Sequence, residues 1–261
     1  MFMKKLIISK LLLYVIAMTY NVIILSAGIG SRLRPLTFKK PKSLLKVGGL
    51  PIIDHQILSF AKCGIKRFHV VVGYKATVLM KHLSKSFNYP DFEFLYIYNP
   101  RYRETNTAYS LWLASSLFVN APTFVVNGDL LINAETVMRM LKSNVSCIGY
   151  RKHKCGEEEV KLRLIGDRVF EIGKGLCALK ADGEYVGIAM FERKVGVFFR
   201  VALDEVVKSG GVDMYYDDVI QKLVSQFYIK GVDLTDLPVM EIDTIEELEE
   251  ANVLYEKSQA T

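Results

Sequence analysis

Glycines and cationic side chains gather in one short stretch near the N-terminal end of the chain. Between Ser26 and Lys46 there is no acidic residue, and Gly28 and Gly30 are accompanied by Arg32, Arg34, Lys39, Lys40, Lys42 and Lys46. A glycine-rich turn lets backbone N–H groups approach an anion, and neighbouring cations neutralise its charge. The stretch therefore predicts a loop that binds a polyphosphate.

Two familiar phosphate-binding loops are excluded. The dinucleotide-binding fingerprint requires a third glycine where this chain has Leu33. The G-x-x-x-x-G-K-[ST] pattern of P-loop proteins does not occur in the sequence. The apolar run over residues 22–25 predicts a buried parallel strand, which places the basic loop at a strand's carboxyl end, where ligands of such sheets bind.

Strand and helix patterns alternate along the first half of the chain. Strands are predicted over residues 22–25, 68–72, 92–98 and 123–126, and helices over 52–63, 76–87, a segment containing Trp112, and 134–141. This order predicts a Rossmann-like three-layer α/β/α fold around a mostly parallel sheet. A strand over 145–150 and a hairpin over 160–172 then predict a small antiparallel β insertion. Further helices are expected over 197–208, 219–226 and 245–255.

The stretch Leu25–Pro51 resembles the signature loop of the nucleotidyltransferases that make NDP-sugars and CDP-alcohols. Their pattern is a strand followed by A-G-x-G-x-R-L, P-L-T, P-K-x-L-L-x-V and G-x-P. It is present here as Ala27, Gly28, Gly30, Arg32, Leu33, Pro35, Leu36, Thr37, Pro41, Lys42, Leu44, Leu45, Val47, Gly49 and Pro51. The resemblance covers residues 22–255. It implies a fold of the nucleotide-diphospho-sugar transferase type, in one domain over 21–261 with a nucleotide-binding half (21–142) and an acceptor-binding half (143–261).

The implied reaction joins an NTP to a phosphate monoester and releases pyrophosphate. The resemblance makes Arg32 and Lys42 catalytic, with Arg32 on the leaving pyrophosphate and Lys42 between the α-phosphate and the acceptor. It implies that the nucleotide is bound by Leu25, Ala27, Gly28, Gly30, Asn106, Thr107 and Gly128. Asn106 could equally serve only as the N-cap of the helix that follows it.

Magnesium is the cofactor that the resemblance implies, bound by Asp129 and Asp243 with Glu241 as a helper. Alternation over residues 239–243 places Glu241 and Asp243 on one face of a predicted strand. Three carboxylates would form an all-oxygen site that suits Mg²⁺. The alternative for Asp129 is a structural carboxylate that caps a turn.

The resemblance assigns Lys174 to the acceptor phosphate and Glu184 to the acceptor pocket. Tyr216 and Asp217, in the run Tyr215-Tyr216-Asp217-Asp218, could surround a quaternary ammonium through cation–π contact and charge. They could equally mark a helix start, where acids suit the positive end. Glu158 and Lys161 match a family motif, but they could simply pair on a strand surface.

The segment E-T-N-x-x-Y-S-L over residues 104–111 resembles the cytidylyltransferase branch. We therefore expect CTP as donor and a phosphorylated alcohol, phosphocholine-like or inositol-like, as acceptor. One alternative is a sugar-1-phosphate nucleotidyltransferase that uses UTP, dTTP or GTP. The other is a non-catalytic regulatory subunit, which the presence of Asp129, Asp243 and Lys42 disfavours.

Composition agrees with a small polyanionic substrate. The net charge of the 261 residues is +6, yet the bases concentrate in the loop while residues 241–250 hold six acids and no base. A nucleic-acid-binding protein would show a broader basic face, so no nucleic-acid partner is expected. The four cysteines have no metal-binding or paired spacing, which suits a reducing cytoplasm. A homodimer is left open.

Residues 1–20 form an apolar extension that begins with Lys4 and Lys5. Lys10 interrupts the run and no small-residue cleavage site follows, so neither a signal peptide nor a stable membrane span is expected. We interpret the segment as a non-native or mis-assigned extension with Met18 as the start, or alternatively as a short membrane anchor.

Overall fold

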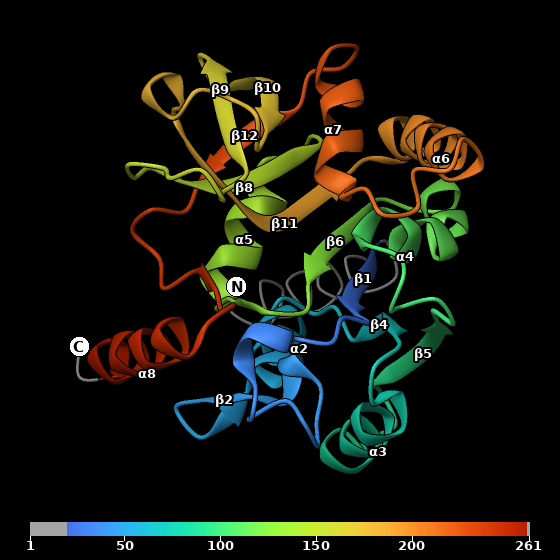
Figure 1. Ribbon diagram of the computed structural model, residues 1–261, viewed down its shortest axis with the longest axis vertical. Helices are drawn as coiled ribbons and strands as arrows, with labels where there is room; N and C mark the ends of the chain where they lie inside the picture. Colours follow the sequence, from blue (N-terminus) through green and yellow to red (C-terminus); the bar gives the residue numbers. More distant parts are fainter. Residues whose placement is uncertain (1–19, 260–261) are drawn as a thin grey trace, which may run out of the picture.

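The computed structural model describes residues 20–259 of the chain. Within these residues the backbone forms one nine-stranded sheet in the order β5-β4-β1-β6-β11-β8-β12-β10-β9 (Figure 1). Its strands are β1 (Asn21–Ser26), β4 (Arg67–Val72), β5 (Glu93–Tyr98), β6 (Thr123–Asn127), β8 (Cys147–Arg151), β9 (Lys161–Ile165), β10 (Arg168–Gly173), β11 (Gly183–Phe191) and β12 (Lys230–Asp233).

The first four strands in this order are parallel to one another. The chain moves outward from β1 to β4 and β5 through α2 (Ile52–Lys62) and α3 (Ala76–Ser86), and then returns through α4 (Thr107–Leu113) to place β6 on the other side of β1. The direction of winding therefore reverses between β1 and β6. In open α/β sheets this reversal leaves a crevice at the carboxyl ends of the strands, where ligands bind.

The second half of the sheet is mixed. β11 runs antiparallel to both β6 and β8, β12 is parallel to β8, and β10 and β9 form the predicted hairpin. Gly166, in the hairpin turn, has φ 64°, a conformation that glycine adopts without strain. The Rossmann-like fold with an antiparallel part is thus confirmed, and the antiparallel strands continue the same sheet.

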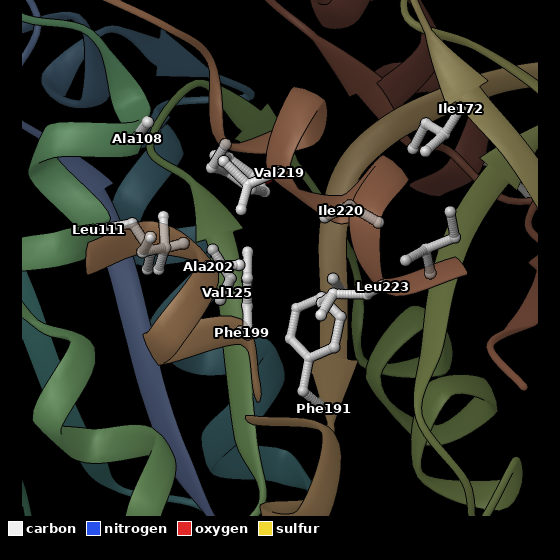
Figure 2. Packing of buried hydrophobic residues seen from close by; sticks show 14 of the residues in the cluster. Ala108, Leu111, Val125, Ile172, Phe191, Phe199, Ala202, Val219, Ile220 and Leu223 are labelled. Atoms are coloured by element: carbon white, nitrogen blue, oxygen red, sulfur yellow. The ribbon is translucent and has the colours of Figure 1, made fainter. Parts of the chain in front are cut away.

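Both faces of the sheet are covered by helices. On one face α4, α6 (Arg193–Lys208) and α7 (Tyr216–Val224) bury residues such as Leu111, Phe199 and Ile220 against β6 and β11 (Figure 2). On the other face α2, α3 and α5 (Ala134–Lys142) cover a second core. Residues of β1 alternate between the two cores, which is why the strand is apolar throughout.

A third core lies under α8 (Ile245–Gln259), beside two short two-stranded sheets. One is a hairpin of β2 (Lys46–Val47) with β3 (Leu50–Pro51), and the other is a long-range antiparallel pairing of β7 (Leu130–Leu131) with β13 (Met240–Glu241). The second pairing carries the C-terminal segment to the end of β6. The short 3₁₀ helices are η1 (Ser31–Leu33), η2 (Lys42–Leu44), η3 (Ser115–Val119) and η4 (Ala178–Lys180).

Three predicted boundaries were wrong. The strand expected over residues 239–243 is only the two-residue β13, so Asp243 lies beyond it. α7 begins at Tyr216 rather than Val219, and α6 begins at Arg193 rather than Val197. In both helices the first turn is polar or mixed, and an apolar pattern does not reveal such a turn.

The apolar extension and the proposed start at Met18 lie outside the described residues. Among the helices of residues 20–259, none has the length and apolar character required to cross a membrane.

Candidate active site

One cavity of about 1030 Å³ opens at the carboxyl ends of β1 and β6 and continues to β11 and α7. All the site residues predicted from sequence line it except Ala27, which is 5% exposed and lies in the core beside the loop. The lining set is Leu25, Gly28, Gly30, Arg32, Lys42, Asn106, Thr107, Gly128, Asp129, Lys174, Glu184, Tyr216, Asp217, Glu241 and Asp243. The two halves of the chain therefore share one site.

The basic loop after β1 is held in a fixed shape with its glycines facing the cavity. Gly30 has φ 64°, and the hydroxyl of Thr37 donates a hydrogen bond of 2.8 Å to the Gly30 carbonyl. A Cβ at Gly30 would lie 3.0 Å from Cβ of Lys42, whereas a Cβ at Gly28 would meet nothing within 4 Å. Gly30 is therefore required by the turn, and Gly28 leaves open space for an incoming phosphate.

The turn after β6 is held in place by hydrogen bonds from α2. Gln56 of α2 is fully buried, and its amide donates hydrogen bonds of 2.7 Å to the carbonyls of Asn127 and Leu130. A Cβ at Gly128 would lie 2.5 Å from the Leu25 carbonyl, so only glycine allows this approach to β1. The turn thereby directs Asp129 into the cavity opposite the basic loop.

Lys42 joins the two carboxylates predicted to hold a metal. Its Nζ donates a 2.7 Å hydrogen bond to Asp129 and another hydrogen bond to Asp243, whose second oxygen lies 2.8 Å from Arg32. Burial opposes the charge on Lys42, but the carboxylates outweigh it and raise the pKa of its ammonium. Burial likewise opposes the charge on Asp243, but Lys42 and Arg32 outweigh it and lower the pKa of that carboxyl.

Asp129 and Asp243 fit a magnesium ion. One oxygen of Asp129, Oδ1, is buried without a hydrogen-bond partner in the described part of the chain, and a cation already lies between the two carboxylates. Within that part no group of three or more His, Cys, Asp or Glu side chains could hold a metal by itself. Mg²⁺ is commonly held by one or two carboxylates together with substrate phosphates, which is what this pair could provide.

Glu241 lies on the cavity wall but is engaged elsewhere. Its Oε1 accepts a 2.6 Å hydrogen bond from the amide of Asn127. Burial, followed by the nearby negative charge of Asp129, raises the pKa of Glu241 well above its usual value. Its role as a helper ligand stays a prediction.

The segment predicted to contact the base forms the start of α4. Asn106 is the N-cap, and its side chain accepts a 2.8 Å hydrogen bond from the backbone N–H of Thr107. The capping interpretation of Asn106 is thus confirmed. Because Asn106 and Thr107 also line the cavity, a contact with the nucleotide remains compatible with the cap.

The far end of the cavity combines basic and acidic side chains. Lys174 lies 3.7 Å from Glu158, and Glu184 pairs with His153 at 2.7 Å. Burial raises the pKa of Glu184. Asp217 is 5% exposed, its Oδ2 has no hydrogen-bond partner among residues 20–259, and burial raises its pKa to about 6. A buried carboxylate oxygen without a partner is costly, and a cationic ligand group would offset that cost.

The two neighbouring tyrosines have different environments. Tyr216 is 1% exposed, so most of its ring is covered and the expectation that this ring receives a cation does not fit. Tyr215 is 40% exposed, and Nζ of Lys174 lies 4.8 Å from its ring centroid. The ring that is open to cation–π contact therefore belongs to Tyr215.

Lys161 neither pairs with Glu158 nor faces solvent. It is 2% exposed, and its ammonium donates hydrogen bonds of 3.0 Å to the carbonyls of Gly156, Glu157 and Glu159. Its three donors are thus all used on one loop. That loop carries Glu158 and Glu159 on the cavity wall.

Sequence reasoning missed several cavity residues, among them Asn127, Arg151, His153 and Tyr185. Asn127 directly precedes the Gly128-Asp129 turn, so it had a local signal. Arg151 and His153 had none, because the pairing of β8 with β11 is what brings them beside Glu184.

Comparison with known proteins agrees with this geometry. Residues 21–149 match the nucleotidyl transferase family. The 2-aminoethylphosphonate cytidylyltransferase of Lancefieldella rimae is 28% identical over 87% of this chain and 90% of its own length. The choline-phosphate cytidylyltransferase of Streptococcus pneumoniae is 25% identical over 86% of this chain and 93% of its own length.

The solved structure of CTP:phosphocholine cytidylyltransferase from Streptococcus pneumoniae has the same fold. It superposes with a TM-score of 0.75 and 22% identity, covering 91% of this chain and 99% of that one. With the signature loop, the shared cavity and these relatives together, residues 21–149 belong to the nucleotidyl transferase family, and the chain as a whole is similar to cytidylyltransferases.

Proposed function

We propose that this protein is a magnesium-dependent cytidylyltransferase that joins CTP to a small phosphorylated or phosphonylated acceptor carrying an ammonium group. The observation that carries the proposal is that the two ends of one cavity carry different functional groups. The Gly28–Lys42 loop and the Asp129–Asp243 pair lie at one end, and Lys174 and the buried Asp217, whose Oδ2 has no hydrogen-bond partner among residues 20–259, lie at the other. A zwitterionic acceptor would match the second end with its anionic group on Lys174 and its cation on Asp217.

In the proposed reaction an oxygen of the acceptor attacks the α-phosphorus of the nucleotide in line. A new P–O bond forms, the bond to the β-phosphate oxygen breaks, and pyrophosphate leaves. The acceptor oxygen is already ionised near pH 7, so no general base is needed, and catalysis depends on positioning and charge neutralisation. Magnesium, held by Asp129 and Asp243, would supply part of that neutralisation.

The chain's own residues have separate tasks in this scheme. Backbone N–H groups at Gly28 and Gly30 would bind the triphosphate, and Arg32 would stabilise the departing pyrophosphate. Lys42 would leave the carboxylates to contact the α-phosphate and the acceptor. Tyr215 would add cation–π contact to the acceptor ammonium, worth about 0.5–2 kcal/mol.

Two relatives support the choice of acceptor. Both are named for acceptors that carry a charged nitrogen, 2-aminoethylphosphonate and choline phosphate. In this chain the matching chemical feature is the Asp217 carboxylate beside the exposed ring of Tyr215.

The test is a grid of the four ribonucleoside triphosphates and dTTP against a panel of acceptors, with pyrophosphate release as the readout. The panel holds phosphocholine, phosphoethanolamine, 2-aminoethylphosphonate, inositol phosphate, glucose-1-phosphate and mannose-1-phosphate. We expect CTP with a cationic acceptor to exceed every other pair at least tenfold in kcat/KM. A tenfold preference for UTP, dTTP or GTP with a hexose-1-phosphate would refute the assignment.

Asp217→Asn sharpens this test. With a cationic acceptor its KM should rise, while the KM for CTP should not change. The KM for an acceptor without a cationic group, such as inositol phosphate, should be unaffected by the substitution. Asp218→Asn, one residue along α7, is the matched control.

A further inference from the structure

A chain of hydrogen bonds connects the acceptor side of the cavity with the metal side. The Glu241 carboxylate accepts from Nδ2 of Asn127 at 2.6 Å, which turns Oδ1 of Asn127 toward α7. That oxygen accepts from the hydroxyl of Tyr216 at 3.0 Å. The Tyr216 oxygen lies 2.6 Å from the hydroxyl of Tyr185, which is therefore the donor in that pair.

Each member of this chain comes from a different element. Tyr185 lies on β11, Tyr216 begins α7, Asn127 ends β6 and Glu241 ends β13. Tyr185 and Tyr216 are 3% and 1% exposed, so water has little access to them as a substitute partner. Buried polar chains of this kind hold their members in one arrangement when all are satisfied.

Gly187 provides the space that this chain of hydrogen bonds occupies. Gly187 has φ 78° and lies where the register of β11 shifts. A Cβ at Gly187 would lie 2.4 Å from Oε1 of Glu241 and 2.6 Å from Nδ2 of Asn127. The sheet is thus shaped around the contact between Asn127 and Glu241, and only glycine fits there.

Tyr216 also contacts the start of α4, which lines another side of the cavity. Its backbone N–H donates a 3.1 Å hydrogen bond to the hydroxyl of Thr107, in the segment that lines the nucleotide side. Next to it, the N–H of Ala108 bonds the carbonyl of Met214 at 3.1 Å. Tyr216 is therefore the residue at which α4, the end of β6 and β11 meet.

We propose that Tyr216 is a positioning residue that fixes the acceptor end of the cavity relative to the Asp129 turn, acting through Asn127. This inference rests on the nucleotidyl transfer proposed above. In-line attack requires the acceptor oxygen and the α-phosphorus to be held at a set distance and angle, and small misplacements lower the rate strongly. The hydroxyl of Tyr216, at the start of α7, donates a hydrogen bond to Asn127, at the end of β6. This bond links the acceptor end of the cavity to the Asp129 turn.

Tyr216→Phe is the direct test, because it removes the hydroxyl and keeps the buried ring. We expect kcat to fall by about tenfold or more while the KM values for CTP and acceptor change less than about threefold. Tyr185→Phe leaves the Tyr216–Asn127–Glu241 part of the chain intact, so its loss of kcat should be smaller. Tyr228→Phe is the control, since it removes a 2.7 Å hydrogen bond to Asp167 away from the cavity.

A double-mutant cycle distinguishes positioning from a merely structural role. If Tyr216 acts through Asn127, adding Asn127→Ala to Tyr216→Phe should lower kcat little further than the worse single variant. Two losses that multiply would overturn the proposal, as would a Tyr216→Phe variant with wild-type kcat. If Tyr216→Phe does not remain folded, Asn127→Ala alone tests the link, because it removes the oxygen that accepts from the Tyr216 hydroxyl, and a wild-type kcat in that variant would overturn the proposal.

Hydrogen exchange provides a readout that does not depend on the reaction. In full-length Tyr216→Phe, the amides of residues 127–130 and 214–217 should exchange faster together, while those of β4 should not change. If the amides of either segment exchanged at the wild-type rate, the result would contradict a link between the two segments through Tyr216. If the wild-type enzyme turned over no donor–acceptor pair, the proposed function would fail, and this exchange result would still decide whether Tyr216 joins the two walls.

Discussion

The Nζ atom of Lys42 donates a hydrogen bond of 2.7 Å to Oδ2 of Asp129, and the two residues lie 87 positions apart in sequence. The same ammonium also bonds Asp243. The cation that we propose to be catalytic thus lies between the two carboxylates that are suited to a divalent ion. Two cations cannot share this position without strong repulsion, so the proposed binding of metal and nucleotide would displace Lys42.

Lys42→Ala should therefore separate catalysis from metal affinity. We expect kcat/KM to fall by about 10²-fold or more, since a cation aimed at developing charge is lost. Mn²⁺ binding without nucleotide, measured by electron paramagnetic resonance, should become tighter because its competitor is gone. Lys39→Ala, which removes an exposed lysine of the same loop, should change neither quantity. Weaker Mn²⁺ binding by Lys42→Ala would contradict the competition.

Asp129→Asn and Asp243→Asn should each abolish Mg²⁺-dependent turnover. Each substitution replaces an anionic oxygen ligand by a neutral amide in a site that Mg²⁺ and phosphate share. The measurement is rate against Mg²⁺ concentration at saturating CTP. A variant that kept the wild-type titration curve would show that its residue is not a ligand. Asp91→Asn, which removes a surface partner of Lys66, is the control.

The stability of the protein should depend on Asp217 across a defined pH window. The pKa of Asp217 is raised from 3.8 to about 6 by burial, so between these values the folded state binds more protons than the unfolded state. Stability is then lost as pH rises through about 6. Asp217→Asn removes this dependence, at a gain of about 2–3 kcal/mol above pH 7.

Thermal unfolding of wild type and Asp217→Asn at pH 4 and pH 8 checks this. The Tm of Asp217→Asn should exceed the Tm of the wild type by a small amount at pH 4 and by a large amount at pH 8. A cationic acceptor should reduce the difference by stabilising only the wild type. A constant difference across the range would exclude Asp217 as the titrating group.

Lys161→Met should loosen the loop of residues 156–159. Three carbonyls would lose their common donor, and each buried group left without a partner costs about 1–3 kcal/mol. We expect a lower Tm and a higher KM for the acceptor, with KM for CTP unchanged, because the loop lines only the acceptor end. Lys152→Met removes an exposed lysine that pairs with Asp233 and should leave both KM values as they are. Equal effects on both substrates would indicate a global loss of folding instead.

The sequence by itself determined the parallel half of the fold and the glycine-rich basic loop. The run around Ile23 is apolar on both faces because helices cover both sides of β1, and Gly28, Gly30, Arg32 and Lys42 are close enough in sequence to act as one local motif. Asp129 was also recognisable, because it follows a buried strand and a glycine. Such features are set by neighbours in the chain, so a local pattern reveals them.

Only the tertiary structure decided how these parts meet. Asp243 reaches Lys42 because β13 pairs with β7, a contact between segments more than 100 residues apart that no periodicity encodes. The different environments of Tyr215 and Tyr216 follow from where α7 begins, and its first turn is too polar for an apolar pattern to detect. The Glu241–Asn127–Tyr216–Tyr185 chain depends on four elements and on the backbone conformation of Gly187. Long-range packing sets such contacts, and the order of residues along the chain carries no local sign of them.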